Sequence, residues 1–375
     1  MTKRANGEGM LRQRSDGRWE ARLSVDGNAR AFYGKTQREV RAKLDEAKRT
    51  IQDGLPLPAG RETVEQYLAR FLEAVKPGVR PRTYEAYALN VRRLTPHIGR
   101  RQLAKLSPGD VQHCYAALLE GGLSRRSVEQ AHAVLHLALK LALQQGEMAR
   151  NPTEAVTVPR PAHREMKTLA TEQLHALFAA TTGDRLHALW VVLGTAGLRV
   201  GEVLGLRWDD IDLDGKRLVV RRALQRQRGT GFVLVEPKSA RSRRTVLLSD
   251  FAVSAAREHR RRQAAEILAA GPLWEDRERA RVFTRPNGMY MEAARVREAL
   301  ARALRKAGLP DVRVHDLRHG VASMLLEEGK SVKLVADMLG HSTVVLTLDT
   351  YSHVTPAMHA DAAATMDRLF GAAGG

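Results

Sequence analysis

The sequence predicts a multidomain, mainly α-helical protein of the α+β class that carries small β-sheets. Three observations support this: apolar residues recur at helical spacing over most of the chain, Asp-Gly turns interrupt a short β-rich start, and Pro-rich linkers separate the segments. A chain of 375 residues can form two or three hydrophobic cores. We therefore expect domains over residues 1–55, 56–150 and 168–375, with a linker over 151–167.

The first segment has the pattern of a small three-stranded sheet followed by one helix. Asp-Gly pairs at 16–17 and 26–27 are typical hairpin turns between short runs of strand-forming residues. Thr-Gln-Arg-Glu at 36–39 is a capping-box pattern that opens a helix, and Gly54 ends it. The side chains spaced to line the buried face of this helix are Val40, Leu44, Ala47 and Ile51.

The second segment shows only helical patterns. Four helices are expected, over residues 63–75, 82–95, 108–120 and 125–145. Apolar residues recur on one side of each, as they do in helices that pack together around a core. The side chains expected in that core include Tyr67, Phe71, Tyr87, Val91, Val111, Tyr115, Val128, Leu135 and Leu139.

The last segment mixes helices with a small sheet. Short strands are expected at 217–223 and 282–285, and the run 237–246 reads as a hairpin tip that leads into a further strand. The expected helices start near Thr171, Arg199 and His315, and span residues 185–195, 250–269, 291–307, 331–339 and 356–370. This segment is therefore expected to be a mixed but mostly helical domain.

Composition favours a polyanion as the partner. The formal net charge is +19 and the isoelectric point is near 10.5. A ribosomal or generic basic protein is the alternative that charge alone leaves open. Cys114 is the only cysteine, so neither an intramolecular disulfide nor a thiolate zinc cluster can form, which fits a reducing cytoplasm. No run of about 18 uninterrupted apolar residues occurs, so we expect no membrane association.

A group of cationic and phenolic side chains indicates phosphate chemistry. His315 and Arg318 stand at i and i+3, so on a helix both point the same way. Arg199 lies upstream, and His341 and Tyr351 follow. Two guanidiniums can meet the negative charge that develops on a phosphodiester under attack, and a phenol can serve as the nucleophile once a base or a cationic field activates it. No metal or other cofactor is required by this scheme.

The order and spacing of these motifs resemble those of the tyrosine recombinases of the phage integrase family. The matching fragments are Gly-Leu-Arg-x-x-Glu at 197–202, His-x-x-Arg-His at 315–319, Leu-Gly-His-Ser at 339–342 and the following Tyr351. Lys238 stands in the Pro-Lys-Ser context of the family's general acid. The resemblance implies a reaction that cuts one DNA strand through a 3′-phosphotyrosyl bond and rejoins it to another 5′-hydroxyl.

The resemblance implies six catalytic residues, namely Arg199, Lys238, His315, Arg318, His341 and Tyr351. In this assignment Tyr351 attacks the scissile phosphate while Arg199 and Arg318 brace its non-bridging oxygens. Lys238 protonates the leaving 5′-oxygen and His315 exchanges the tyrosine proton. His341 hydrogen-bonds the phosphate.

The resemblance also gives each domain a role on DNA. Residues 1–55 resemble an arm-type DNA-binding domain, 56–150 a SAM-like core-binding domain and 168–375 a catalytic domain. Cations that would contact DNA under this reading are Arg18, Arg22, Arg80, Arg82, Arg125, Arg126, Arg241, Arg243 and Arg244. For each of them an ordinary solvated surface charge is the alternative.

The expected partner is double-stranded DNA carrying attachment sites, bound by a homotetramer, with an excisionase or a DNA-bending protein as a further partner. The expected location is the cytoplasm of a bacterium, on the nucleoid, with a phage or mobile element as the source. The closing helix at 356–370 could dock on a neighbouring protomer or on its own domain.

Three other functions are compatible with parts of the sequence. A zinc site at His315 and His319 is disfavoured because Arg318 between them would repel a cation. A type IB topoisomerase shares the chemistry, but the separate first module favours an integrase. A DNA-binding architectural protein or repressor would need neither the tyrosine nor the arginines.

Overall fold

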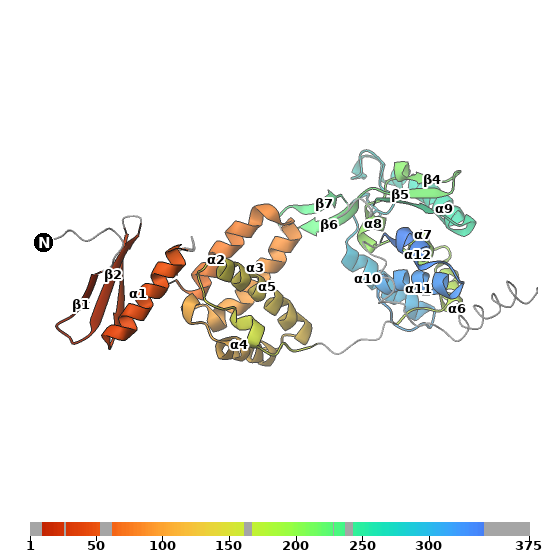
Figure 1. Ribbon diagram of the computed structural model, residues 1–375. Coiled ribbons are helices and arrows are strands. Elements are labelled where there is room, and N and C mark those ends of the chain that lie inside the picture. Colours follow the sequence, from red (N-terminus) through yellow and green to blue (C-terminus); the bar gives the residue numbers. More distant parts are fainter. Residues whose placement is uncertain are drawn as a thin grey trace, which may run out of the picture. The chain divides into compact units, whose positions relative to one another are not determined.

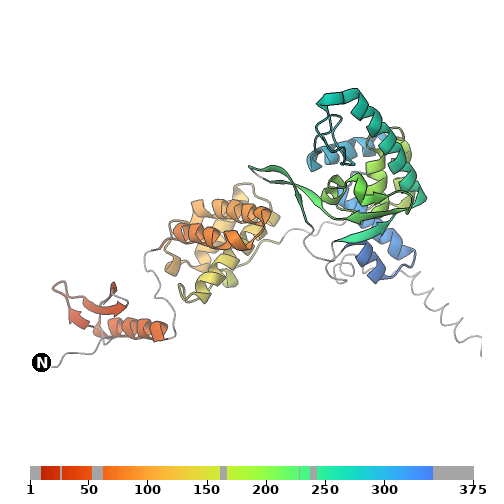
Figure 2. The ribbon, with the colours of Figure 1, turned by 90° about the horizontal axis from the view of Figure 1, so that it is seen from above.

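The computed structural model describes residues 10–25, 28–52, 62–160, 167–227, 229–236 and 243–340. The chain divides into two compact units, Met1–His163 and Arg164–Gly375. Figures 1 and 2 show mainly helical segments with small antiparallel sheets, which confirms the fold class expected from the sequence.

The first unit begins with a three-stranded antiparallel sheet, β1 (Met10–Gln13), β2 (Trp19–Val25) and β3 (Asn28–Gly34), in the order β1-β2-β3. Helix α1 (Gln37–Gln52) lies along one face of it (Figure 1). The core between them is formed by Ala21, Leu23, Val40, Leu44 and Ala47. The sheet, the helix and these three helix positions are as the turn signals and the periodicity predicted, and the side chain of Ile51 lies outside the described residues.

Four helices form the rest of the first unit around a second hydrophobic core. They are α2 (Val64–Val75), α3 (Pro81–Ile98), α4 (Pro108–Glu120) and α5 (Arg125–Gln144), joined by the 3-10 turns η1 (Lys76–Gly78) and η2 (Leu103–Lys105) and followed by η3 (Pro152–Ala155). Thr63 and Ser107 cap the starts of α2 and α4 by accepting the backbone N–H three residues on. The four expected helices are all present, and their apolar side chains pack together in this core.

Within the described residues, the second unit contains, in chain order, α6 (Thr171–Thr181), α7 (His187–Ala196), α8 (Val200–Leu204), η4 (Trp208–Asp210), β4 (Ile211–Asp212), β5 (Arg217–Val220), β6 (Ala223–Gln227), β7 (Gly231–Val235), β8 (Arg244–Leu247), α9 (Asp250–Ala270), η6 (Gly271–Leu273), α10 (Ala293–Lys306), α11 (Val314–Glu327) and α12 (Val332–Leu339). Helix α7 is buried along almost its whole length and packs against α6, α9 and α11. Strands β4, β5 and β8 form one antiparallel sheet, and β6 pairs with β7 in a separate ribbon that extends away from it (Figure 2).

One strand prediction in this unit was confirmed in part and another was wrong. Of the expected strand 217–223, residues 217–220 form β5, and only Ala223 belongs to β6, in a different sheet. Between them Arg221 and Arg222 turn their guanidiniums toward the buried carboxylate of Asp210. Residues 282–285 contribute only an isolated bridge between Thr284 and Tyr290. The reason is that side chains of α9 occupy the hydrogen-bonding position that a neighbouring strand would fill at the carbonyl of Val282. Gln263 donates to this carbonyl, and Nε2 of His259 lies 2.7 Å from it.

Among the described residues, no helix has both the length and the apolar character that crossing a bilayer requires.

The burial of α7 leads to a stability prediction. Leu193→Ala removes a side chain with no exposed surface and should lower the free energy of unfolding by about 2–5 kcal/mol. Leu268→Ala, the same change at a side chain that is 82% exposed, should change it by less than about 0.5 kcal/mol. Urea unfolding followed by the fluorescence of Trp190, Trp208 and Trp274 measures both, and equal losses would contradict this assignment of the core.

Candidate active site

Arg199 owes its position to the sharp end of α7. Gly197 ends that helix in the left-handed region, with φ of +60°. A Cβ at this position would lie 2.5 Å from Cδ2 of Leu339, so only glycine fits. Arg199 follows with extended backbone as the residue before α8, and its backbone N–H donates to Glu202 at 2.9 Å. Its Nη1 donates to the other oxygen of the same carboxylate at 2.8 Å.

Arg318 comes from α11 and is almost completely buried, with 2% of its surface exposed. Its Nη1 donates to the carbonyl of Gly197 at 2.7 Å, and its Nη2 donates to the carbonyl of Leu339 at 2.6 Å. These carbonyls belong to the carboxyl ends of α7 and α12, where helices leave acceptors unsatisfied and carry partial negative charge. One guanidinium therefore joins the ends of two helices.

The side chain of Arg244 is buried, which the sequence pattern did not predict. We expected this residue of β8 to contact DNA phosphates, but its side chain is only 5% exposed. Nη1 and Nη2 donate to the two oxygens of Glu202, at 3.3 and 2.9 Å, and Nε donates to the carbonyl of Met338 at 2.6 Å. The proposed phosphate contact is therefore corrected. The alternation of β8 carried the signal, since Arg244 shares its buried side with Val246.

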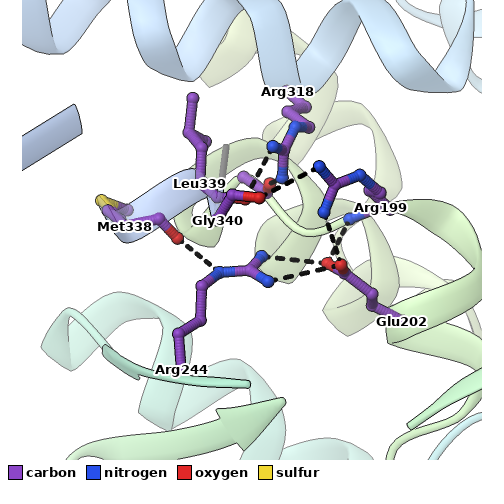
Figure 3. A network of polar contacts seen from close by, with 8 residues as sticks. Arg199, Glu202, Arg244, Arg318, Met338, Leu339 and Gly340 are labelled. Carbon is purple, nitrogen blue, oxygen red and sulfur yellow. Dashed lines mark hydrogen bonds and ion pairs between the residues drawn. The ribbon is translucent and has the colours of Figure 1, made fainter. Parts of the chain in front are cut away.

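Three guanidiniums thus meet at the carboxyl end of α12 (Figure 3). Arg244 and Arg318 hold the last two helical carbonyls, and Nη2 of Arg199 lies 3.3 Å from the carbonyl of Gly340. Burial alone would raise the pKa of Glu202, but hydrogen bonds and attraction from Arg244 and Arg199 hold that pKa below its ordinary value. Glu202 is therefore a carboxylate at neutral pH.

His315 stands in the first turn of α11, beside this cluster. His315 is an exposed residue, and its ring lies edge-to-face on the ring of His319, with centroids 4.7 Å apart. Partial burial, together with the neighbouring His319, Arg318 and Arg199, lowers the pKa of His315 to about 4. The direction of this shift matters for chemistry, because a neutral imidazole can accept a proton at pH 7.

Four of the expected site residues, Lys238, Arg241, His341 and Tyr351, lie outside the described residues. The described chain ends at Gly340, directly before His341, so the cluster of three arginines holds the segment that leads into it.

The expected DNA contacts differ in their surroundings. In the described segments Arg18, Arg80, Arg82 and Arg125 are exposed. Three more are exposed but lie against carboxylates, namely Arg22 on Glu20, Arg126 on Glu129 and Arg243 on Glu236. Their contacts with DNA stay predictions.

Glu20 shows how the first sheet arranges its cations. Its carboxylate has no exposed surface although it lies on the side of β2 away from α1. Arg22 donates to it at 2.6 Å and Arg12 at 2.8 Å, and both hydrogen bonds lower the pKa of Glu20. The side chain of Arg14 lies over the ring of Tyr33. The outer side of the sheet is therefore basic, with one carboxylate holding two of its arginines.

In chemical terms the second unit offers guanidiniums fixed by backbone carbonyls, next to a neutral imidazole. Such a site can bind a phosphodiester and exchange a proton. This arrangement fits chemistry on a phosphodiester. Comparison with known proteins agrees: the Phage integrase family matches residues 167–358, and the family described as Phage integrase, N-terminal SAM-like domain, matches residues 63–119.

The chain belongs to the phage integrase family of tyrosine recombinases, enzymes that cleave and rejoin DNA at specific sites. A tyrosine recombinase XerC-like protein of Caldanaerobacter subterraneus subsp. tengcongensis is 30% identical over 357 residues, which cover 90% of this chain and 91% of that protein. An integrase of Streptomyces ambofaciens is 31% identical over 351 residues, 90% of this chain and 88% of that one.

Solved structures share the fold. The Tn1549 transposon integrase in complex with a circular intermediate DNA has a TM-score of 0.70 at 23% identity, over 82% of this chain and 99% of that one. A lambda integrase tetramer bound to a Holliday junction has a TM-score of 0.56 at 16% identity, over 93% of this chain and 96% of that one. The expected family, fold class and enzyme class are therefore confirmed.

The environment of His315 leads to a prediction about pH. Its ring should titrate near pH 4, below the value of about 6.5 for an unfolded chain. Because the unfolded ring takes up its proton first, the stability that the neutral ring contributes is complete above about pH 6.5 and is lost as the pH falls toward 4. NMR titration of the histidine ring signals, assigned with a His315→Asn variant, measures this pKa. A value at or above 6.5 would contradict the structure.

Proposed function

We propose that this recombinase integrates or excises a phage or mobile element at attachment sites, and that six residues carry the reaction: Arg199, Lys238, His315, Arg318, His341 and Tyr351. The observation that carries the proposal is the cluster formed by Arg199, Arg318 and the nearby neutral ring of His315. The order of the same motifs in the sequence supports it.

The proposed cleavage is a transesterification. The phenol oxygen of Tyr351 attacks the scissile phosphorus and forms a 3′-phosphotyrosyl bond, while the bond to the 5′-oxygen breaks. The phenol proton passes to His315, and Lys238 gives a proton to the departing 5′-oxygen. A 5′-hydroxyl of another strand then reverses these steps. One phosphoester bond forms for each one that breaks, so no nucleotide energy source is needed.

The arginines suit the part of this reaction that develops charge. Each guanidinium presents donors in a fixed plane, and contacts to carbonyls and to Glu202 set the planes of Arg199 and Arg318 before DNA arrives. A bound phosphate would offset the positive charge around His315, which favours proton uptake by the ring when the phenol attacks.

The domains would divide the work of DNA binding. Residues 1–55 would bind arm-type sites and residues 56–150 would bind the core site. Residues 151–167 would link these domains to the catalytic domain, residues 168–375, which would cleave the DNA. The net charge of +19 favours such extended contact with phosphates. The candidate contacts are Arg18, Arg22, Arg80, Arg82, Arg125, Arg126, Arg241 and Arg243.

The same proposal covers assembly and location. A homotetramer on two attachment sites would perform the exchange in the cytoplasm, on the nucleoid. An excisionase or a DNA-bending protein would set its direction. The lambda integrase tetramer on a Holliday junction supports this stoichiometry by analogy of fold.

The nucleophile can be tested with a nicked duplex of candidate attachment sequence, taken from DNA that flanks the gene. The native chain should form a covalent protein–DNA adduct, whereas Tyr351→Phe should form none and should bind the duplex as before, because it lacks only one oxygen. Denaturing gel electrophoresis detects the adduct. Addition of EDTA should leave the native yield unchanged, since no step uses a metal.

An adduct with Tyr351→Phe, or loss of the native adduct in EDTA, would overturn the mechanism. Relaxation of a supercoiled plasmid that lacks attachment sequence would instead favour a topoisomerase.

The forked contacts predict a large effect of a small change. Arg199→Lys and Arg318→Lys should each slow adduct formation by about 100-fold or more, because an ammonium replaces a bidentate guanidinium. Arg217→Lys, at an arginine of β5 that is 59% exposed, should have little effect. Single-turnover rates at saturating protein measure all three. Equal rates for the variants and the native chain would contradict the assigned roles.

A further inference from the structure

Arg244 is buried and charged, yet no step of the proposed reaction uses it. It comes from β8 and reaches two different parts of the second unit. Its Nη atoms donate to Glu202 at the start of α8, and its Nε donates to the carbonyl of Met338 at the end of α12. Arg199 contacts the same carboxylate and the same end of α12 (Figure 3).

The charges of these groups matter for Arg199. The carboxylate of Glu202 is 6% exposed, so water screens it little, and it lies 2.8 Å from Nη1 of Arg199. An ion pair between these two alone would have no net charge, and the attraction of Arg199 for an anion would be weakened accordingly. With Arg244 on the other side, the three groups together carry a formal charge of +1.

We propose that Arg244 is a positioning residue of the recombination reaction, which neutralises Glu202 so that the charge of Arg199 remains available to the scissile phosphate. Through Met338 it also fixes the carboxyl end of α12. This inference rests on the proposed role of Arg199.

Two further observations support the inference. The guanidinium of Arg244 packs closely against the residue that ends α12, since a Cβ added to Gly340 would lie 2.9 Å from Nη1 of Arg244. The pKa of Glu202 is held below its ordinary value despite burial, and Arg244 makes the largest contribution in that direction. Arg244 therefore keeps Glu202 ionised, and an ionised Glu202 in turn holds Arg199.

Four variants separate charge from architecture. Arg244→Met removes the charge and keeps much of the volume. Arg244→Lys keeps the charge and loses the fork. The double variant Glu202→Gln with Arg244→Met removes both charges of the pair. Arg217→Met is the matched control, because Arg217 belongs to the same sheet and forms an exposed ion pair with Asp212.

The single-turnover rate of adduct formation on the nicked duplex is measured for each, together with duplex binding and thermal unfolding. Arg244→Met should be slower than native by about 100-fold or more, while Arg244→Lys should stay within about tenfold. The double variant should be at least about tenfold faster than Arg244→Met, because no uncompensated carboxylate remains beside Arg199. Arg217→Met should react at the native rate.

A second substrate tests the charge directly. A duplex with a methylphosphonate at the scissile position has lost the negative charge on one non-bridging oxygen, so it depends less on the charge of Arg199. The defect of Arg244→Met should therefore be at least about tenfold smaller on this duplex than on the phosphodiester. A variant that merely disturbs packing would show the same defect on both.

Equal losses in Arg244→Met and Arg244→Lys, or a double variant no faster than Arg244→Met, would overturn the inference. If Arg244→Met does not fold, a folded Arg244→Lys decides: a rate within about tenfold of native supports the role of charge, and a loss beyond about 100-fold overturns it. An undiminished rate in Arg244→Met would refute this inference alone. Absence of an adduct with native protein and with Arg217→Met would refute the proposed function instead.

Discussion

A carboxylate shared by two guanidiniums is the interaction on which the rest of the second unit depends. Glu202 lies almost without exposure between Arg199 and Arg244, which come from the start of α8 and from β8. A buried carboxylate without partners would be strongly destabilising, and hydrogen bonds and attraction from Arg244 and Arg199 hold the pKa of Glu202 below its ordinary value. In return, the carboxylate holds Arg199 by its backbone and by its side chain. A local helix start and a long-range ion pair thereby fix the side chain of Arg199.

The second constraint is the carboxyl end of α12. Helices end with unsatisfied carbonyls, and here the carbonyls of Met338 and Leu339 are held by Arg244 and Arg318. Arg318 also donates to the carbonyl of Gly197 at the end of α7. The arginines proposed to bind phosphate therefore also cap the carboxyl ends of the helices around them. In the proposed reaction few rearrangements of Arg199 and Arg318 would be needed when a phosphate enters, because contacts to Glu202 and to backbone carbonyls already orient both guanidiniums. Arg318 and Arg199 also disfavour protonation of the nearby ring of His315, which helps to keep that ring neutral.

The helices and the motif residues could be predicted from the sequence, whereas contacts between residues far apart in the chain could not. Helix limits followed from caps and apolar spacing, and α4 spans the residues expected. Arg199 and Arg318 were predicted as site residues from short motifs in the order typical of the family, and the structure places both guanidiniums at the carboxyl end of α12. The burial of Arg244 was missed because its partners lie 42 and 94 residues away, and a run of arginines reads as an exposed basic loop. The strand at 282–285 was wrong for a similar reason, since side chains of α9 replace a neighbouring strand.

The most direct measurement is the site of DNA attachment. Adduct formed on the nicked duplex is digested with nuclease and trypsin, and the peptides are analysed by mass spectrometry. The expected product is a nucleotide joined through its 3′-phosphate to Tyr351, the single tyrosine of the tryptic peptide that spans residues 334–368. A nucleotide on a serine, a histidine or another tyrosine, or attachment through a 5′-phosphate, would contradict it.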